Sequence, residues 1–215
     1  MSTKGLVDGG RARRQAMDME ASACLSVKYW RMIETQRLRL RSWADADIEP
    51  WAEMNCDPRV MEFFPHQITR EYSREQAARV RIDLERNGYG WFVLERKAEP
   101  GFAGVIVIDD IHWDTPFLPR REIGWRLPTY AWGQGFATEA ARAALEYAFE
   151  KLAWPEIVAM TSRLNVRSIR VMEKLGMVRD ADCDFEHPRV PEGHPIRPHV
   201  LYRKFATTPG TKKMA

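Results

Sequence analysis

The chain has 215 residues, of which 45% are hydrophobic, and a formal net charge of +3 at pH 7. This balance is typical of a globular protein with one domain of ordinary size. Acidic and basic residues alternate along the chain, which argues against a dedicated nucleic-acid surface. No apolar run approaches the roughly 20 residues that a membrane span needs. Cys24, Cys56 and Cys183 are odd in number and widely spaced, without metal-ligand spacing, so a disulfide framework is not expected and a reducing cytoplasm fits best.

The two ends of the chain differ from the rest in composition. Residues 1–31 are small, polar and in part basic, without the apolar segment of a secretory signal. We expect residues 1–31 to be a disordered or non-native extension, residues 32–205 to form the folded domain, and residues 206–215 to be a disordered tail.

The first predicted elements are a strand and two helices. Arg37–Arg41 alternates polar and apolar residues with the period of a half-buried strand. Asp45 and Asp47 offer N-caps for a helix that runs to about Asn55. Ser73–Gln76 has the form of a capping box and predicts the start of a second helix. The apolar stripe and the end of that helix are given by Ala77, Val80, Leu84 and Asn87-Gly88.

The middle of the chain predicts a hairpin, a strand and a long helix. Gly90–Glu95 and Gly101–Asp109 are rich in β-branched and aromatic residues and are joined by turn residues. Glu122–Leu127 reads as a further strand that ends before Pro128. Phe136–Leu152 has one continuous apolar face, which predicts a helix.

The last part predicts two strands around a short helix and a long loop. Glu156–Met160 is a short buried strand, and Asn165 can cap the helix that follows. Gly176 is placed to end that helix, and Met177-Val178 begins another strand. The helix is predicted to share one apolar side between Val166, Ile169, Met172 and Leu175. The chain then continues through a proline- and histidine-bearing loop, Asp182–Pro198, to a final strand, His199–Arg203.

The turn before the long helix carries the strongest functional signal. Gly133 and Gly135 flank Gln134, and the small residues Ala137 and Thr138 follow. Glycine takes positive φ at little cost and allows close approach of a ligand to the backbone. The first N–H groups of a helix have no intrahelical partner and lie at the positive end of its dipole. The turn therefore predicts a site for a pyrophosphate and hence a phosphorylated cofactor.

With this turn, the order of the elements resembles that of GNAT-type N-acetyltransferases, in particular the branch of ribosomal-protein N-terminal acetyltransferases (RimJ/RimL-like). The resemblance covers about residues 32–205. It rests on Glu34–Arg41, Glu122–Leu127, Tyr130–Ala140 and Asn165–Ser168 leading to Glu173–Met177. It implies an α+β fold, with a mixed, mostly antiparallel sheet of about six to seven strands flanked by about four helices.

The resemblance implies acetyl-CoA as the acetyl donor. Backbone N–H groups from about Gln134 to Thr138, with Gly133, Gly135, Phe136 and Ala137 in the turn, would bind its diphosphate. Trp132 stands where the family pattern has Gln or Arg, so a basic contact to the phosphates is missing. The backbone groups of Trp125, Arg126 and Leu127 would pair with the pantetheine arm at the place where the family splays this strand from its neighbour.

Acetyl transfer to an amine requires a neutral amine, donors for the oxyanion and a proton or hydrogen bond for the leaving thiolate. Glu122 is the candidate base, since it opens the strand that the cofactor would pair with. The alternative is that Glu122 is a structural partner of a nearby arginine such as Arg120 or Arg126. Many family members protonate the thiolate with a Tyr, but Met172 occupies that position here.

Ser168, three residues after Asn165, is the substitute that the resemblance suggests for this missing acid. The alternative for Ser168 is a helix hydroxyl that satisfies local backbone groups. Asn165 is expected both to cap its helix and to contact the pantetheine amides. The histidines of the Asp182–Pro198 loop are read as surface or pocket-wall residues and not as metal ligands. Acidic residues of that loop would favour a cationic acceptor.

The sequence therefore predicts transfer of an acetyl group to a primary amine, by direct attack in a ternary complex. The acceptor would be a small molecule or a peptide or protein N-terminus, and the enzyme a monomer or homodimer without nucleic-acid or membrane partners. A non-catalytic acyl-CoA-binding module is the alternative that Met172 leaves open. A dinucleotide oxidoreductase is disfavoured, because Gly133–Thr138 lacks the third glycine of a Rossmann turn and lies late in the chain.

Overall fold

The computed structural model describes residues 32–65 and 68–207. The predicted extension, 1–31, and most of the predicted tail, 206–215, lie outside these residues, so both stay predictions. The centre is a nine-stranded sheet in the order β1-β2-β3-β4-β5-β6-β9-β7, with β8 paired to β9. Its strands are β1 (Met32–Glu34), β2 (Leu38–Arg41), β3 (Gly90–Arg96), β4 (Phe102–Asp110), β5 (Arg121–Arg126), β6 (Glu156–Ser162), β7 (Val178–Arg179), β8 (Phe185–Glu186) and β9 (Pro198–Phe205).

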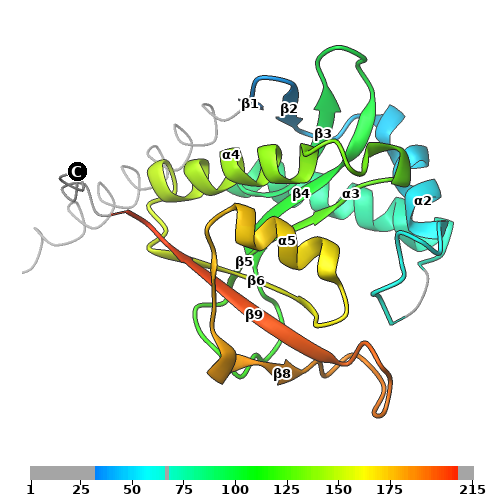
Figure 1. Ribbon diagram of the computed structural model, residues 1–215. Helices are drawn as coiled ribbons and strands as arrows, with labels where there is room; N and C mark the ends of the chain where they lie inside the picture. The colour runs from blue at the N-terminus through cyan, green and yellow to red at the C-terminus, as the bar shows by residue number, and fades with distance from the viewer. Residues whose placement is uncertain (1–31, 66–67, 208–215) are drawn as a thin grey trace, which may run out of the picture.

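Four α-helices in the described part of the chain cover the sheet. They are α2 (Ile48–Cys56), α3 (Arg70–Asn87), α4 (Phe136–Glu150) and α5 (Val166–Lys174). Figure 1 shows α4 and α5 in front of the sheet and α3 behind it. Neighbouring strands are antiparallel except for β5 and β6, which are parallel. The expected α+β fold is confirmed, and the short strands β1, β7 and β8 account for the larger number of strands.

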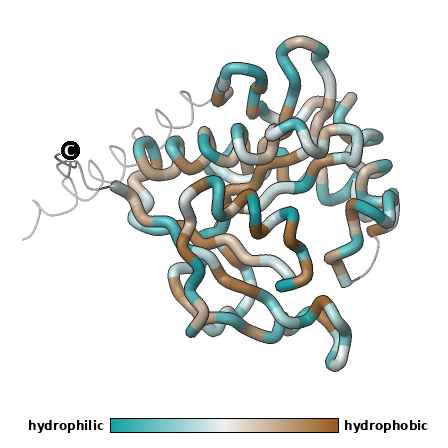
Figure 2. The backbone as a smooth tube through the Cα atoms, in the orientation of Figure 1, coloured by the Kyte–Doolittle hydropathy of each residue, from teal (hydrophilic) through white to brown (hydrophobic). Residues whose placement is uncertain are grey.

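The core lies between the sheet and its helices. α4 packs closely because its buried face is small, with Ala140, Ala141, Ala144 and Ala148 all fully buried around Leu145. Figure 2 shows hydrophobic residues along the inner strands and hydrophilic residues on the outward turns of the helices. Burial of these apolar faces is the main favourable contribution to folding. None of the helices in the described residues is long and apolar enough to cross a membrane.

The predicted start of α3 is wrong, whereas α2 starts after Asp47 as expected but without a side-chain cap. α3 begins at Arg70, and the Thr69 hydroxyl accepts the capping hydrogen bond from the Tyr72 amide. Ser73 is instead fully buried within the helix, and its hydroxyl accepts a hydrogen bond from Asn55. Asp47 is the N-cap residue of α2 but makes no side-chain cap, because its carboxylate accepts two hydrogen bonds from Arg41 and one from the Ala44 amide. Asn55 and Arg41, which are not part of the helices concerned, therefore contact the two side chains that the sequence suggested as caps, Ser73 and Asp47.

The structure of α5 agrees with most of its prediction. The Asn165 side chain accepts a hydrogen bond from the Ser168 amide, so the predicted N-cap is confirmed. Met172 and Leu175 are buried as expected. Val166 is 50% exposed, so its predicted place on the apolar side is wrong. As the first helical residue it precedes the turn at which the helix first packs on the sheet.

Candidate active site

A cavity of about 800 Å³ opens where β5 and β6 separate, between the start of α4, the start of α5 and the β8 region. Its volume lies within the range of small-molecule sites. Every predicted site residue lines it except Gln134. The Gln134 side chain points elsewhere and donates to the Tyr130 carbonyl. The structure therefore brings together residues from three separate parts of the sequence, and Gln134, of which only backbone contacts were expected, is the one that does not line the cavity.

The start of α4 has the geometry of an anion site. Gly133 and Gly135 have φ of 73° and 79°, in the left-handed region that favours glycine. Helical hydrogen bonding begins with the Glu139 amide, which donates to the Gly135 carbonyl at 3.0 Å. The amides of residues 136–138 precede this bond and lack intrahelical acceptors. They point out of the helix at its positive end, as a diphosphate site requires.

Arg37, from the loop before β2, supports this turn from outside the cavity. Its Nη1 donates to the Gln134 carbonyl at 3.0 Å, and its Nη2 lies 2.6 Å from the Glu139 carboxylate. The guanidinium also packs over the Phe136 ring at 4.8 Å. The sequence had suggested only that a basic residue was missing at Trp132. The structure supplies a cation next to the turn from a residue almost a hundred positions away, which no local pattern could have indicated.

The separation of β5 from β6 is pronounced. The two strands pair at Glu122 and Val158 and at no other position within their described lengths. Backbone groups of Trp125 and Arg126 that face β6 lie beyond that pair, as expected for a strand that receives an extended ligand. The Leu127 carbonyl is different, because it accepts a hydrogen bond from the Trp132 indole at 2.8 Å. The expectation of a free Leu127 carbonyl is therefore wrong.

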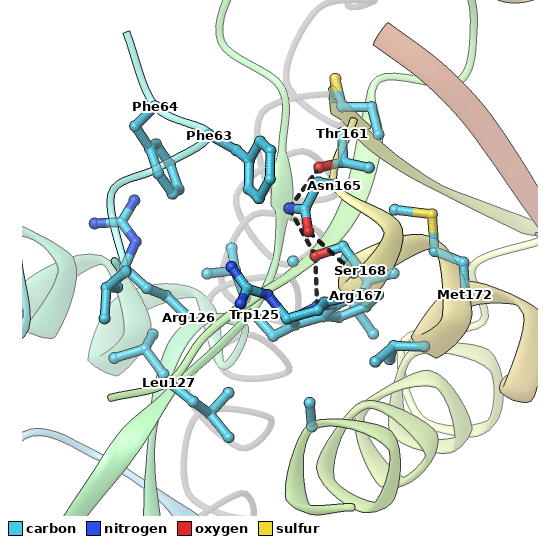
Figure 3. A pocket seen from close by; sticks show the side chains of 18 of the residues that line it. Phe63, Phe64, Trp125, Arg126, Leu127, Thr161, Asn165, Arg167, Ser168 and Met172 are labelled. Carbon is cyan, nitrogen blue, oxygen red and sulfur yellow. Dashed lines mark hydrogen bonds between the residues drawn. The ribbon is translucent and has the colours of Figure 1, made fainter. Parts of the chain in front are cut away.

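Ser168 lies at the centre of a small hydrogen-bond network across the cavity (Figure 3). Its Oγ accepts from Asn165 Nδ2 at 3.1 Å and from Trp125 Nε1 at 3.3 Å. Asn165 Nδ2 also donates to Thr161 Oγ1 at 3.1 Å. None of these contacts joins the Ser168 hydroxyl to a backbone group, so the alternative of a locally satisfied helix hydroxyl does not describe it.

Glu122 faces the cavity from the other end of β5. No described residue forms a hydrogen bond or ion pair with its carboxylate, and Arg120 pairs with Asp114 instead. Burial raises the pKa of Glu122 to about 7, the neighbouring charge of Asp109 adds to the rise, and Arg189 opposes it. The alternative role as a structural partner of Arg120 or Arg126 is therefore not seen. A carboxylate with a pKa near neutrality is suited to proton transfer.

The wall beside Glu122 is aromatic and was not predicted in detail. His187 and His199 line the cavity, with ring centroids 4.7 Å apart, and Trp113 lies 5.1 Å from His187. Burial lowers the pKa of His187 to about 4, with smaller effects of the same sign from His199 and Arg189. Burial also lowers the pKa of His199 below its ordinary value, so both imidazoles favour the neutral form at pH 7. No group of residues suited to hold a metal ion occurs among the described residues.

The acidic residues of the 182–198 loop do not reach the cavity. Asp184 pairs with Arg179, and Glu186 pairs with Arg197. Neither lines the cavity wall. The expectation of a cationic acceptor, which depended on these two carboxylates, therefore has no basis in the structure.

Comparison with known proteins identifies the family. A model described as an acetyltransferase (GNAT) domain matches residues 37–178, more than half of the chain. The chain belongs to the GNAT acetyltransferase family. The N-acetyltransferase YnaD of Bacillus subtilis, itself uncharacterized, is 30% identical over 162 residues, which are 75% of this chain and 89% of YnaD.

Solved structures agree with this family. The crystal structure of a GNAT-family acetyltransferase from Bacillus anthracis is 28% identical, with a TM-score of 0.68, over 81% of this chain and 98% of that one. RimL, a ribosomal L7/L12 α-N-protein acetyltransferase in complex with coenzyme A, has a TM-score of 0.64 over 81% and 97% of the two chains. Its identity of 16% shows a shared fold alone. This GNAT protein is an acetyl-CoA-dependent N-acetyltransferase, and the comparisons lend no support to a non-catalytic module.

Proposed function

We propose that this GNAT enzyme acetylates a primary amine with Glu122 as the base and Ser168 as the hydrogen-bond donor to the departing thiolate. The acceptor would be a small molecule or a peptide or protein N-terminus. The observation that carries this proposal is that Glu122, Ser168 and the free amides of α4 line one cavity. Binding, deprotonation and release of the leaving group can therefore take place in a single enclosed space.

The α4 turn fits the diphosphate of acetyl-CoA, because the amides of residues 136–138 are donors without intrahelical acceptors. We propose that the backbone of Trp125 and Arg126 and the side chain of Asn165 hold the pantetheine arm. When bound, acetyl-CoA supplies the acetyl group as a thioester. The protein contributes the site, its orientation and the proton transfers.

The hydrogen bonds of Ser168 support its proposed role. A hydroxyl has one donor hydrogen and two acceptor lone pairs. Asn165 and Trp125 both donate to Ser168 Oγ, so both lone pairs are used. The hydroxyl hydrogen of Ser168 is then the one hydrogen-bonding position of this hydroxyl that has no partner among the described residues. It is free to donate to a sulfur atom in the cavity, as the Tyr that Met172 replaces would do in relatives.

Glu122 is supported as the base by its isolation and by its pKa of about 7. At neutral pH a large share of the side chain is ionised and can accept a proton, directly or through a water molecule. An α-amine has an ordinary pKa of about 7.7–8.0 and needs less help than a lysine amine of about 10.4. The proposed base is therefore needed more for a strongly basic alkyl amine than for an α-amine.

The cellular setting belongs to the same proposal. Cys56 and Cys183 are free thiols in the structure, which suits a reducing cytoplasm. We propose that the enzyme acts there on amine-bearing acceptors, as a monomer or homodimer and without nucleic-acid or membrane partners.

An amine-panel screen tests the proposed function. Purified enzyme is mixed with acetyl-CoA and single amines, including small molecules and short peptides with free N-termini, and thiol release is followed. At least one class is expected to give turnover that Ser168→Ala and Glu122→Gln reduce. Tight binding of CoA without turnover on any amine would contradict the proposed roles of both residues.

A further inference from the structure

Arg126 lies four residues after Glu122 on β5. Side chains alternate between the two faces of a strand, so residues 122, 124 and 126 share one face. Trp125 reaches Ser168 on α5, whereas Arg126 reaches Asn55 on α2. Arg126 and Glu122 therefore lie on the same side of the sheet, at opposite ends of the strand. Gly124 between them leaves the floor of the cavity open.

The Arg126 guanidinium is enclosed but has no acidic partner. It packs over the rings of Phe64 and Trp51, 4.1 Å and 5.1 Å from their centroids. No carboxylate of the described residues lies within ion-pair distance. Burial lowers the pKa of Arg126 to about 10, so it remains charged at neutral pH. A half-buried cation packed between aromatic rings without a counter-ion is unfavourable, which makes this arrangement informative.

A buried polar chain holds this guanidinium in place. Arg126 Nη1 donates to Asn55 Oδ1 at 2.6 Å, and Asn55 Nδ2 donates to Ser73 Oγ at 3.0 Å. Asn55 and Ser73 are both fully buried. Polar groups in such positions need complete hydrogen bonding to be tolerated, and they then fix one geometry. Of the Arg126 nitrogens, Nε and Nη2 have no partner among the described residues. This is the edge with which an arginine binds a carboxylate through two parallel hydrogen bonds.

The charges around the cavity also favour a negatively charged group on the acceptor. Its walls carry six basic side chains and one carboxylate, that of Glu122. The basic residues are Arg59, Arg126, Arg167, Arg170, Lys174 and Arg189. Arg59 pairs with Asp57 and Arg167 with Glu62. Lys174 also lines a groove beside the diphosphate turn. Arg126 lies on the face of the sheet that carries Glu122. It is the half-buried basic residue of this cavity that has no carboxylate partner among the described residues.

We propose that the acceptor carries a carboxylate in addition to its amine, and that the Nε–Nη2 edge of Arg126 binds this carboxylate. The inference rests on the proposed function, since it assumes that the amine lies toward Glu122. Four residues of strand separate the two positions by roughly 13 Å between Cα atoms. The amine and the carboxylate are therefore joined by a spacer of several bonds, as in an ω-amino acid or an acidic peptide, and not by one carbon as in an α-amino acid.

Matched acceptors test this inference on the wild-type enzyme. Initial rates are measured for ω-aminocarboxylates of increasing length and for the corresponding ω-aminoamides, which differ only in charge. We expect kcat/KM to be about ten- to a hundredfold higher for the carboxylate than for the amide at the preferred length. Equal kcat/KM values for the carboxylate and the amide of each pair would overturn the proposal. Because this test uses the wild-type enzyme alone, it does not depend on whether a variant folds.

Arg126→Gln and a matched control separate charge recognition from structure. Arg126→Gln should remove the preference for carboxylates while KM for acetyl-CoA stays within about twofold, because only backbone groups of Arg126 are proposed to contact the cofactor. Arg121→Gln, at the partly exposed start of the same strand and outside the cavity lining, should keep the preference. An equal loss for carboxylates and amides, or a rise in KM for acetyl-CoA, would overturn the inference. Failure to bind CoA or acetylate any amine would instead contradict the proposed function itself.

Discussion

Replacing Glu122 with glutamine tests the proposed proton transfer. The change removes the only carboxylate that lines the described cavity and preserves the size of the side chain. The pKa of Glu122 is about 7, so the wild-type group is roughly half ionised at that pH and about one-tenth ionised one pH unit lower. A positioned base contributes about 10²–10⁴-fold to the rate. We expect Glu122→Gln to lower kcat by an amount in this range.

The pH dependence of kcat/KM makes the test specific. Protonation at low pH removes the base, so the wild-type enzyme should lose activity as pH falls through about 7. Glu122→Gln should lack this acidic limb. The negative charge of Asp109 raises the pKa of Glu122, so Asp109→Asn should move the limb to lower pH. Thiol release is measured on an acceptor whose amine stays unprotonated over this pH range. Calorimetry measures the affinity for CoA. Unchanged turnover in Glu122→Gln, with the acidic limb intact, would refute the reasoning.

The other predictions concern the opposite wall and the packing beneath it. Ser168→Ala should lower kcat more than tenfold without weakening CoA binding, because the lost hydroxyl serves the leaving group; a change confined to KM for acetyl-CoA would argue for a binding role. Gly104→Ala should lower the free energy of unfolding by about 2–4 kcal/mol in urea titrations, since its Cβ would lie 2.6 Å from the Arg126 carbonyl and 2.9 Å from Leu127 Cγ. Gly101→Ala, also at positive φ but with open space around it, should cost less. Equal losses in the two alanine variants would show that crowding is not the cause.

The parts of the site that depend on neighbouring residues were predictable from the sequence. The turn at Gly133 and Gly135 and the start of α4 follow from glycine conformation and from helix ends, which are local properties. The Asn165 cap is equally local. The apolar face of α4 follows from its 3.6-residue period. Family resemblance then supplied Ser168 as the substitute for the residue that Met172 replaces.

The parts that depend on distant contacts were not predictable. Ser73 has the sequence pattern of a capping box, but its hydroxyl is used by Asn55 from another helix. The same Asn55 orients Arg126, a contact across 71 positions of the chain. The neutral pair of His187 and His199 depends on the register between β8 and β9, in which Phe185 faces His199. Only the assembled sheet brings such residues together, so sequence periodicity carries no signal for them.

The binding of CoA at the start of α4 is the central claim, and Ala137 allows a direct test. Ala137→Asp places a carboxylate in the first helical turn, where it favours the helix dipole and should preserve the melting temperature. Ala137→Asn has nearly the same size without the charge. Two charges about 5 Å apart in an effective dielectric of about 20 repel by about 3 kcal/mol, roughly a hundredfold in Kd. Calorimetric titration with CoA should give Kd values that rise about a hundredfold for Ala137→Asp and less than tenfold for Ala137→Asn. Equal affinity of all three proteins, or no binding by the wild type, would contradict the account.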